Sequence, residues 1–288
     1  MTYAGGMEPI RLACVRYLNT APLIEGLEKV QGLQLVPAVP SVIADMVHRG
    51  EADLGLCSVV DCVGLPGDAR GGLTLVPAGM IGCDGPTLTV RVFSTVPFER
   101  VTTLHADTDS HTSVILAQVV LARRFGVRPR VIGFDARERM PLEGEAGASV
   151  EESWPETVLL IGDKVVTDCP PAERYPYQLD LGEEWKKLTG LPFAYAVWMC
   201  RAEDAGSQKV RTAAALLDRH RRHNLGRLEW VIARRVGASR WPEDEARRYL
   251  GELLRFEVGE RERLAVAEFL GAARELGLVA EREVVWAG

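Results

Sequence analysis

Short apolar runs alternate with helix-like segments along the first 60 residues of the chain. Residues 10–15, 33–39 and 53–59 are apolar runs of strand length, and apolar residues recur at helical spacing in 23–30 and 42–50. Pro22 suits the first turn of a helix, Ser41 is a candidate N-cap, and Gly50 is a candidate helix end. This alternation predicts a parallel sheet joined by right-handed crossovers.

A second strand–helix unit begins near residue 101. Residues 101–106 predict a strand, Ser110 is a candidate N-cap, and 114–126 predict a helix that ends at Gly126. Further strands are predicted at 130–134, 157–163 and 192–200, and 136–154, rich in Gly, Glu and Pro, predicts an exposed excursion. From Ala202 onward the pattern is helical throughout, over 214–236, 242–256 and 260–279.

These two α/β halves predict a two-lobed protein, as its length of 288 residues also favours. We expect residues 1–92 and 197–288 to form one discontinuous lobe and 93–196 the other, with strands near 88–93 and 193–199 crossing between them. Ligands of open α/β sheets bind beyond the carboxyl ends of the strands. A ligand site is therefore expected in the cleft between the lobes.

Composition and charge narrow the function classes. The net charge of -6 provides no cationic field for nucleic acid or for an anionic membrane surface. The first residues carry no signal-peptide pattern, and no apolar run approaches the length of a membrane span, which predicts a cytoplasmic protein. The oligomeric state is left open by the sequence.

No sequence motif for a metal or a cofactor is present. The six cysteines are scattered, without a C-x-x-C pair or an accompanying His cluster, so buried, reduced thiols are expected. A P-loop, a G-x-G-x-x-G turn and a G-x-S-x-G elbow are all absent. His220 and His223 lie one turn apart, yet their strongly charged surroundings favour a solvated helix face over a metal site. We expect no bound metal and no cofactor.

Three loops could carry chemistry in the cleft. Asn19 lies between the first strand and its helix, where it could bind a ligand, or support the turn or cap the helix instead. Ser110-His111-Thr112-Ser113 gathers three hydroxyls and an imidazole at a helix N-terminus, which suits a carboxylate, although ordinary capping explains it equally well. Gly162-Asp163 follows a buried strand, where Asp163 could accept a proton or cap the next segment.

Taken together, these loops resemble the menaquinone-biosynthesis family that contains the chorismate dehydratase of the futalosine route. The segments that carry the resemblance, in the family's order, are Tyr17-Leu18-Asn19-Thr20-Ala21-Pro22-Leu23, Gly50-Glu51-Ala52-Asp53-Leu54, Cys83-Asp84-Gly85, Ser110-His111-Thr112-Ser113, Ile161-Gly162-Asp163, Asp180-Leu181-Gly182-Glu183-Glu184-Trp185, Thr189-Gly190-Leu191-Pro192-Phe193 and Ala196-Val197-Trp198.

The resemblance implies a type II periplasmic-binding-protein fold and a carbon–oxygen lyase that converts chorismate to 3-[(1-carboxyvinyl)oxy]benzoate plus water. It implies catalytic roles for Asn19 and Asp163, with Asn19 holding a substrate carboxylate. The proton acceptor is left open among the substrate's own enolpyruvyl carboxylate, Asp163 and His111. The substrate-binding residues that it implies are Tyr17, Thr20, Ser58, Thr89, Ser94, Ser110, His111, Thr112, Ser113 and Gly162.

Two positions depart from the family pattern. His111 stands where the family often has Arg, so a permanent charge becomes one that titrates near neutral pH. Thr89 stands where Ser is expected and keeps the hydroxyl. Two other functions stay open: a cytoplasmic, non-catalytic protein of the same fold that binds small carboxylates, and the sister dihydroxynaphthoate synthase, whose opening loop differs from Tyr17-Leu18-Asn19-Thr20.

Overall fold

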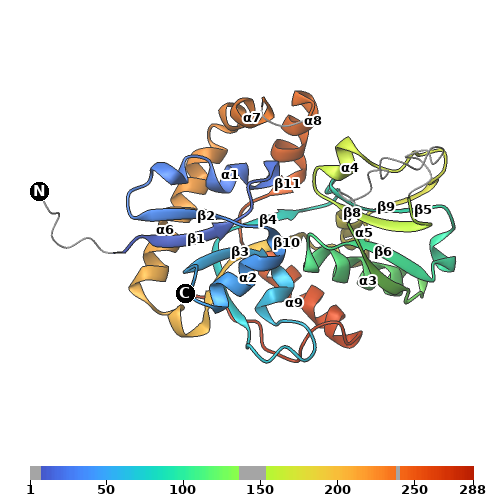
Figure 1. Ribbon diagram of the computed structural model, residues 1–288, viewed down its shortest axis with the longest axis horizontal. Coiled ribbons are helices and arrows are strands. Elements are labelled where there is room, and N and C mark those ends of the chain that lie inside the picture. Colours follow the sequence, from blue (N-terminus) through green and yellow to red (C-terminus); the bar gives the residue numbers. More distant parts are fainter. Residues whose placement is uncertain (1–7, 136–153, 238–240) are drawn as a thin grey trace, which may run out of the picture.

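The computed structural model describes residues 8–135, 154–237 and 241–288, and its strands form two sheets that lie side by side (Figure 1). In spatial order, the first sheet contains β11 (Leu254–Arg255), β4 (Leu73–Cys83), β10 (Phe193–Arg201), β3 (Leu54–Ser58), β1 (Ile10–Cys14) and β2 (Leu33–Pro37). The second contains β7 (Arg130–Phe134), β6 (Thr103–Asp107), β8 (Thr157–Ile161), β5 (Val90–Ser94) and β9 (Tyr177–Asp180).

Helices cover both faces of each sheet. Two helices, α2 and α9, pack on one face of the first sheet, and α1, α6 and α7 lie over the other. The second sheet has α3 and α5 on one face and α4 near the other. Their bounds are α1 Ala21–Ile24, α2 Pro40–His48, α3 His111–Phe125, α4 Lys164–Thr167, α5 Leu181–Thr189, α6 Gln208–Leu225, α7 Leu228–Val236, α8 Glu243–Arg248 and α9 Glu260–Glu275. Short helical turns are η1 Leu18–Thr20, η2 Leu27–Lys29, η3 Val59–Cys62, η4 Phe98–Arg100, η6 Ala202–Asp204 and the π-helical η7 Tyr249–Leu253.

Most predicted strands are confirmed, and so is the cap of α3. The Ser110 hydroxyl accepts a hydrogen bond from the Ser113 amide, and the helix ends at left-handed Gly126. Both sheets are mixed rather than wholly parallel, because β10 pairs antiparallel with β3 and β4, and β5 pairs antiparallel with β8 and β9. The excursion predicted for 136–154 lies outside the described residues except for Trp154, which is buried.

Four local predictions are wrong. The helix predicted over 23–30 breaks at Gly26, whose φ of 89° is left-handed. Helix α2 begins at Pro40, so Val39 is its N-cap and Ser41 lies inside the first turn. The helix predicted over 214–236 is divided into α6 and α7. The C-terminal part is not wholly helical, because Leu254 and Arg255 pair with β4 as the strand β11.

The chain crosses between the sheets twice, and one carboxylate holds both crossings. Asp180 accepts hydrogen bonds from the amides of Thr87 and Leu88 in one crossing and from those of Gly182 and Glu183 in the other. Leu88 has a φ of 72°, a conformation that a branched side chain adopts at a cost of about 1 kcal/mol or more. The expected lobe boundaries at 92/93 and 196/197 fall inside β5 and β10, and each of these strands belongs entirely to one sheet.

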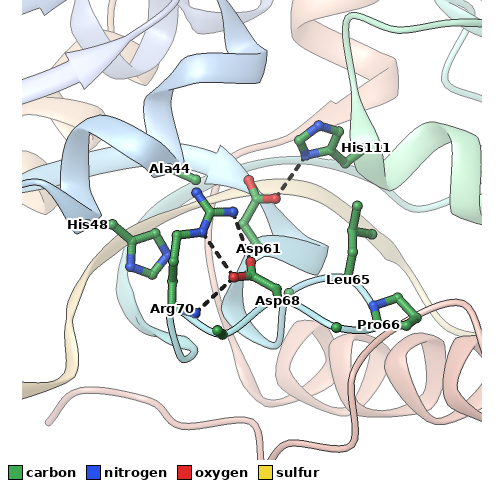
Figure 2. A pocket seen from close by; sticks show the side chains of 11 residues that line it. Ala44, His48, Asp61, Leu65, Pro66, Asp68, Arg70 and His111 are labelled. Atoms are coloured by element: carbon green, nitrogen blue, oxygen red, sulfur yellow. Dashed lines mark hydrogen bonds and ion pairs between the residues drawn. The ribbon is translucent and has the colours of Figure 1, made fainter.

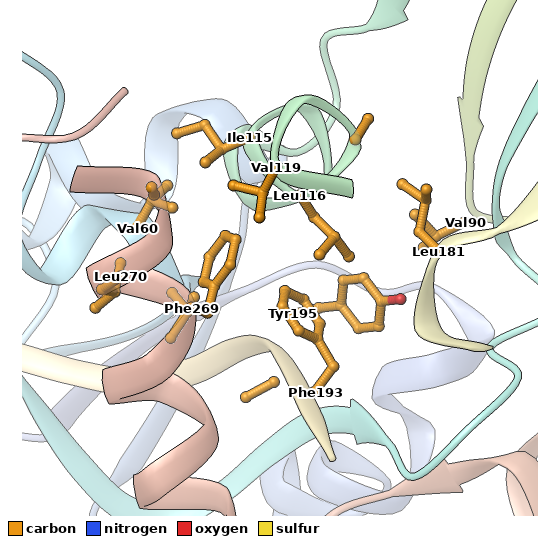
Figure 3. Close-up of a cluster of buried hydrophobic side chains, with 14 of the residues drawn as sticks. Val60, Val90, Ile115, Leu116, Val119, Leu181, Phe193, Tyr195, Phe269 and Leu270 are labelled. Atoms are coloured by element: carbon orange, nitrogen blue, oxygen red, sulfur yellow. The ribbon is translucent and has the colours of Figure 1, made fainter. Parts of the chain in front are cut away.

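On one side of the junction, a single hydrophobic core continues from one sheet to the other (Figure 3). Phe193 and Phe269 come from the first sheet and its helix α9, and Leu116 and Val119 come from α3, which packs against the second sheet. The rings of Phe193 and Phe269 lie 4.8 Å apart in an edge-to-face arrangement. This packing fixes the two sheets relative to each other along that side.

Candidate functional site

The carboxyl ends of β1, β3, β6 and β8 face the junction. In the first sheet, β1 runs parallel to β3, and Ser58 at the end of β3 is opposite Ala196 in β10, close to the point where β10 enters from the second sheet. In the second sheet, Ile161 at the end of β8 is opposite Val90, where β5 enters from the first. The loops after β1, β3, β6 and β8 therefore meet in one region, where ligands of such sheets bind.

The loop after β1 presents Asn19. Thr20 is fully buried, and its hydroxyl donates to the carbonyls of Val15 and Tyr17, so this side chain closes the loop on itself. The turn needs no cap from Asn19, because neither η1 nor α1 receives a side-chain capping bond. The Asn19 Oδ1 atom is buried and has no hydrogen-bond partner among the described residues.

A tyrosine that the sequence analysis missed lies beside Thr89 and near Asn19. The Tyr249 hydroxyl lies 2.7 Å from Thr89 Oγ1, and the Asn19 side chain is close enough to oppose part of the rise that burial causes in the pKa of the phenol. Thr89 and Tyr249 are both 2% exposed, so their hydrogen bond forms away from water. Burial raises the pKa of Tyr249 well above its ordinary value, which keeps the phenol neutral.

Asp163 lies next to this cluster and does not cap α4. Its Oδ1 accepts a 2.8 Å hydrogen bond from the indole nitrogen of Trp241, and no side-chain capping bond forms. Burial raises the pKa of the Asp163 carboxyl, and the bond from Trp241 opposes that shift. Gly162, left-handed with a φ of 76°, donates its amide to the carbonyl of Thr89, which keeps the two loops together.

Trp241 and Tyr249 form one wall of this region. Their rings stack 4.9 Å apart at an angle of 14°. Trp241 precedes α8 and Tyr249 begins η7, and α8 lies beside α4 of the second sheet (Figure 1). The sequence analysis singled out neither residue.

The N-terminus of α3 meets the turn η3 of the first sheet. Thr112 is fully buried, and its hydroxyl accepts a bond from the Val60 amide; Ser113 is also buried. His111 Nδ1 lies 3.0 Å from Asp61 Oδ1. The hydrogen bond with Asp61 raises the pKa of His111 and so favours the cationic form of the imidazole.

A pocket of about 410 Å³ opens beside this ion pair (Figure 2). His48 and the loop from Gly64 to Arg70 form its walls, and His111 and Asp61 form its inner end. Arg70 is already paired with Asp68 and Asp45, so the pocket offers no unpaired guanidinium to a substrate carboxylate.

Not every predicted binding residue lies in this region. Ser94 is opposite Thr157 at the other end of β5, is fully buried, and bonds Thr157 and Val96, so its predicted role in binding is wrong. Thr89 and Gly162 are joined by a hydrogen bond, Thr112 bonds Val60 two residues after Ser58, and Tyr17–Thr20 follows β1 at the same end of the first sheet. The solvated helix face predicted for His220 and His223 is confirmed for the exposed His223, whereas His220 is half-buried with its Nε2 2.6 Å from the Glu25 carbonyl.

The described residues contain no group of three potential metal-binding side chains, and none of their helices is long and apolar enough to span a membrane. Of the six cysteines, five are buried, Cys169 is exposed, and all are unpaired. Burial raises the pKa of several of these thiols, including Cys14 to about 12.

Comparisons with known proteins agree with this geometry. The sequence profile of a family described as menaquinone biosynthesis matches residues 10–275. A chorismate dehydratase of Thermus thermophilus is 29% identical over 248 residues, which are 80% of this chain and 84% of that protein.

Solved structures share the fold at low sequence identity. A Candida albicans protein described as having the generic periplasmic-binding-protein fold superposes with a TM-score of 0.59 at 10% identity, over 96% of this chain and 92% of that one. The ligand-binding component of an ABC-type import system from Staphylococcus aureus gives a TM-score of 0.62 at 10% identity, over 97% and 96% of the two chains. These likenesses establish the fold, as the sequence predicted.

Proposed function

Since this chain belongs to the menaquinone-biosynthesis family, we propose that it is a chorismate dehydratase, a hydro-lyase that acts in the futalosine route. The observation that carries the proposal is the meeting of Asn19, Thr89 and Asp163 at the facing strand ends. The similarity to the Thermus thermophilus enzyme supports it. A cytoplasmic location is part of the same proposal.

The reaction is an elimination that makes the ring aromatic. The C–H bond beside the ether breaks, its electron pair forms a new ring double bond, and the neighbouring C–O bond breaks to release hydroxide. The abstracted proton and the hydroxide together account for the water. The protein must hold a dianion, orient the two scissile bonds and exclude water, which are tasks for hydroxyls, amides and helix N-termini.

The Asn19 Oδ1 atom is a buried acceptor without a partner among the described residues, and a hydroxyl can donate to it whereas a carboxylate cannot. We therefore place the single ring hydroxyl of chorismate at Asn19 Oδ1, in place of the carboxylate expected from the sequence. The N-terminus of α3, a helix of fifteen residues, suits one carboxylate because its amides and dipole favour negative charge. Ser110 and Ser113 lie in the first turn of that helix.

For the proton acceptor we propose the substrate's own enolpyruvyl carboxylate. It lies close to the ring proton within the same molecule, and desolvation in the site raises its basicity. The Asp163 carboxylate accepts a hydrogen bond from Trp241, which suits a residue that lines the site better than one that accepts the substrate proton. His111 Nδ1 is held by Asp61, and this bond raises the pKa of His111 and so favours its protonated form, which cannot accept a proton.

Incubation of the purified protein with chorismate tests the function directly. We expect an aromatic enolpyruvyl ether to form without added metal or nucleotide, and at the same rate in excess EDTA. Binding of chorismate without turnover would support a non-catalytic binding protein instead. Turnover that EDTA abolishes and a divalent ion restores would contradict the proposed cofactor-free elimination.

A further inference from the structure

A second pocket, of about 540 Å³, lies among the helices that cover one face of the first sheet. Its lining comes from the segment 25–30 that follows α1, from the C-terminal half of α6, and from α7. Among the described residues, none from the second sheet or from the loops of the candidate site lines it. Pockets that hold small molecules have volumes of about 300–1,000 Å³, so this one has room for a ligand of its own.

This pocket is cationic, although the whole chain carries a net charge of -6. Four cationic side chains and two carboxylates line it, which gives a net charge of +2 with its two histidines neutral. The cationic residues are Lys29, Arg219, Arg227 and Arg234, and the acidic ones are Glu25 and Glu28. The pocket therefore attracts anions locally, against the field of the molecule as a whole.

The guanidinium of Arg227 is held in place by neutral groups. Its Nε and Nη2 donate to Asn224 Oδ1 at 3.3 and 3.1 Å, and it lies over the ring of Trp230, 4.1 Å from the ring centroid. Asn224 is fully buried, and its side-chain nitrogen donates to two backbone carbonyls in and after α1. No carboxylate in the described parts of the chain pairs with Arg227. The guanidinium is thus oriented in advance and keeps its full charge.

The other cations of the pocket are also incompletely neutralised. Glu25 is buried and pairs with both Arg234 and Arg235, so its single charge compensates only one of the two guanidinium groups. Arg219 and Lys29 are exposed, and within 8–135, 154–237 and 241–288 neither forms an ion pair with a carboxylate. Positive charge is therefore left over for a ligand.

We propose that this pocket binds a small molecule through a phosphate group, with Arg227 as the main contact and Arg219 and Lys29 as further ones. The planar fork of a guanidinium matches two phosphate oxygens, and a phosphate dianion balances the net charge of the pocket. The inference is independent of the proposed function, because binding is measured without turnover.

Calorimetric titrations of the purified protein in low salt test the ligand class. Inorganic phosphate and ribose 5-phosphate are the two phosphate probes, and malonate is a dianion without phosphate. We expect both phosphate probes to bind and malonate to bind more weakly. Tighter binding of ribose 5-phosphate than of inorganic phosphate would support an organic phosphate as the ligand, and equal binding would support the free ion. Malonate that binds as tightly as phosphate would overturn the assignment.

Three variants locate the binding, since the candidate site is also expected to attract anions. Arg227→Gln should weaken phosphate binding about 10- to 100-fold, the effect of losing charged hydrogen bonds. Arg222→Gln is the matched control, because Arg222 lies on α6 outside the pocket lining and pairs with Asp218. It removes the same charge and should change the affinity less than about twofold.

Arg219→Gln keeps the proposal testable if Arg227→Gln disturbs the fold. The Arg219 side chain is exposed, so its replacement should leave the melting temperature unchanged and weaken phosphate binding several-fold. Equal affinities in the wild type, Arg219→Gln and a folded Arg227→Gln would overturn the proposal. So would an equal loss in Arg222→Gln and Arg227→Gln, or the absence of phosphate binding at millimolar concentration.

Discussion

The two sides of the junction between the sheets are held in different ways. On one side, Phe269, Phe193 and Leu116 belong to a dry hydrophobic core that both halves share. On the other, the contacts include two polar ones, Tyr249 with Thr89 and Trp241 with Asp163, and α4 adds the partly buried Val166. Separating a large packed core exposes its apolar surface to water, whereas hydrogen bonds can be exchanged for water at a small net cost.

This difference indicates where the molecule opens. We expect the packed side to act as the fixed axis and the polar side to separate when substrate enters, so that Asn19 and Asp163 become accessible. Ligand binding should then restore the polar contacts and close the site. The four predictions below test this contrast between the packed and polar sides, from the largest expected effect to the smallest.

Removing the ring of Phe269 should damage the packed side most. The side chain is 1% exposed and contacts Trp185 and Phe193 edge to face. Phe269→Ala should lower the free energy of unfolding by about 3–5 kcal/mol, measured by urea denaturation. The kcat of the molecules that remain folded should change little. A loss below 1 kcal/mol would mean that the core does not hold the junction.

Asn19→Asp should damage the site far more than the fold. It keeps the shape, removes the amide donor, and adds a negative charge beside an anionic substrate. Loss of one positioned donor typically costs about 10²–10³ in rate, and we expect a fall of that size in kcat with a melting temperature close to that of the wild type. If turnover stays at the wild-type level, Asn19 does not belong to the active site.

Asp163→Asn tests whether the Asp163 carboxylate removes the substrate proton or only lines the site. The asparagine keeps an oxygen that can accept from Trp241, so the polar contact survives. We expect less than a tenfold loss of kcat, because the substrate supplies the proton acceptor. General-base catalysis contributes about 10²–10⁴ in rate, and a loss in that range would assign the base to Asp163.

The ion pair of His111 with Asp61 should give a small, pH-dependent contribution to stability. Its hydrogen bond raises the folded pKa of His111 above the unfolded value of about 6.5. The contribution is therefore complete below that value and is lost as the pH rises through the folded pKa. Because His111 is 38% exposed, solvent limits the effect to about 1 kcal/mol or less.

Unfolding curves of the wild type and His111→Ala between pH 5 and 9 measure this contribution. The two should differ most at the acidic end and converge toward the alkaline end. A difference that grows with pH would show that the pair does not stabilise the fold in this way.

Local signals in the sequence predicted the loops of the site but not its C-terminal wall. Ser110 and Gly126 bound α3 as predicted, since caps act within one turn of a helix. The contact of Tyr249 with Thr89 spans 160 residues, and no local pattern encodes such a distance.

The error at Ser94 has a related cause. Its hydroxyl would face the site if β5 ended at the junction, but β5 begins there and runs away from it, antiparallel to β8. A pattern of alternating apolar residues predicts a strand without its direction. The direction of each strand relative to its neighbours therefore decides which end of it can contribute to a binding site.

The carboxylate of Asp180 also determines how the two halves can move. Two separate linkers would let the halves slide, twist and tilt independently. Because Asp180 bonds amides in both crossings, we expect the two linkers to turn together and to leave mainly one rotation between the halves. Each closing movement should therefore return Tyr249 and Thr89 to the same register.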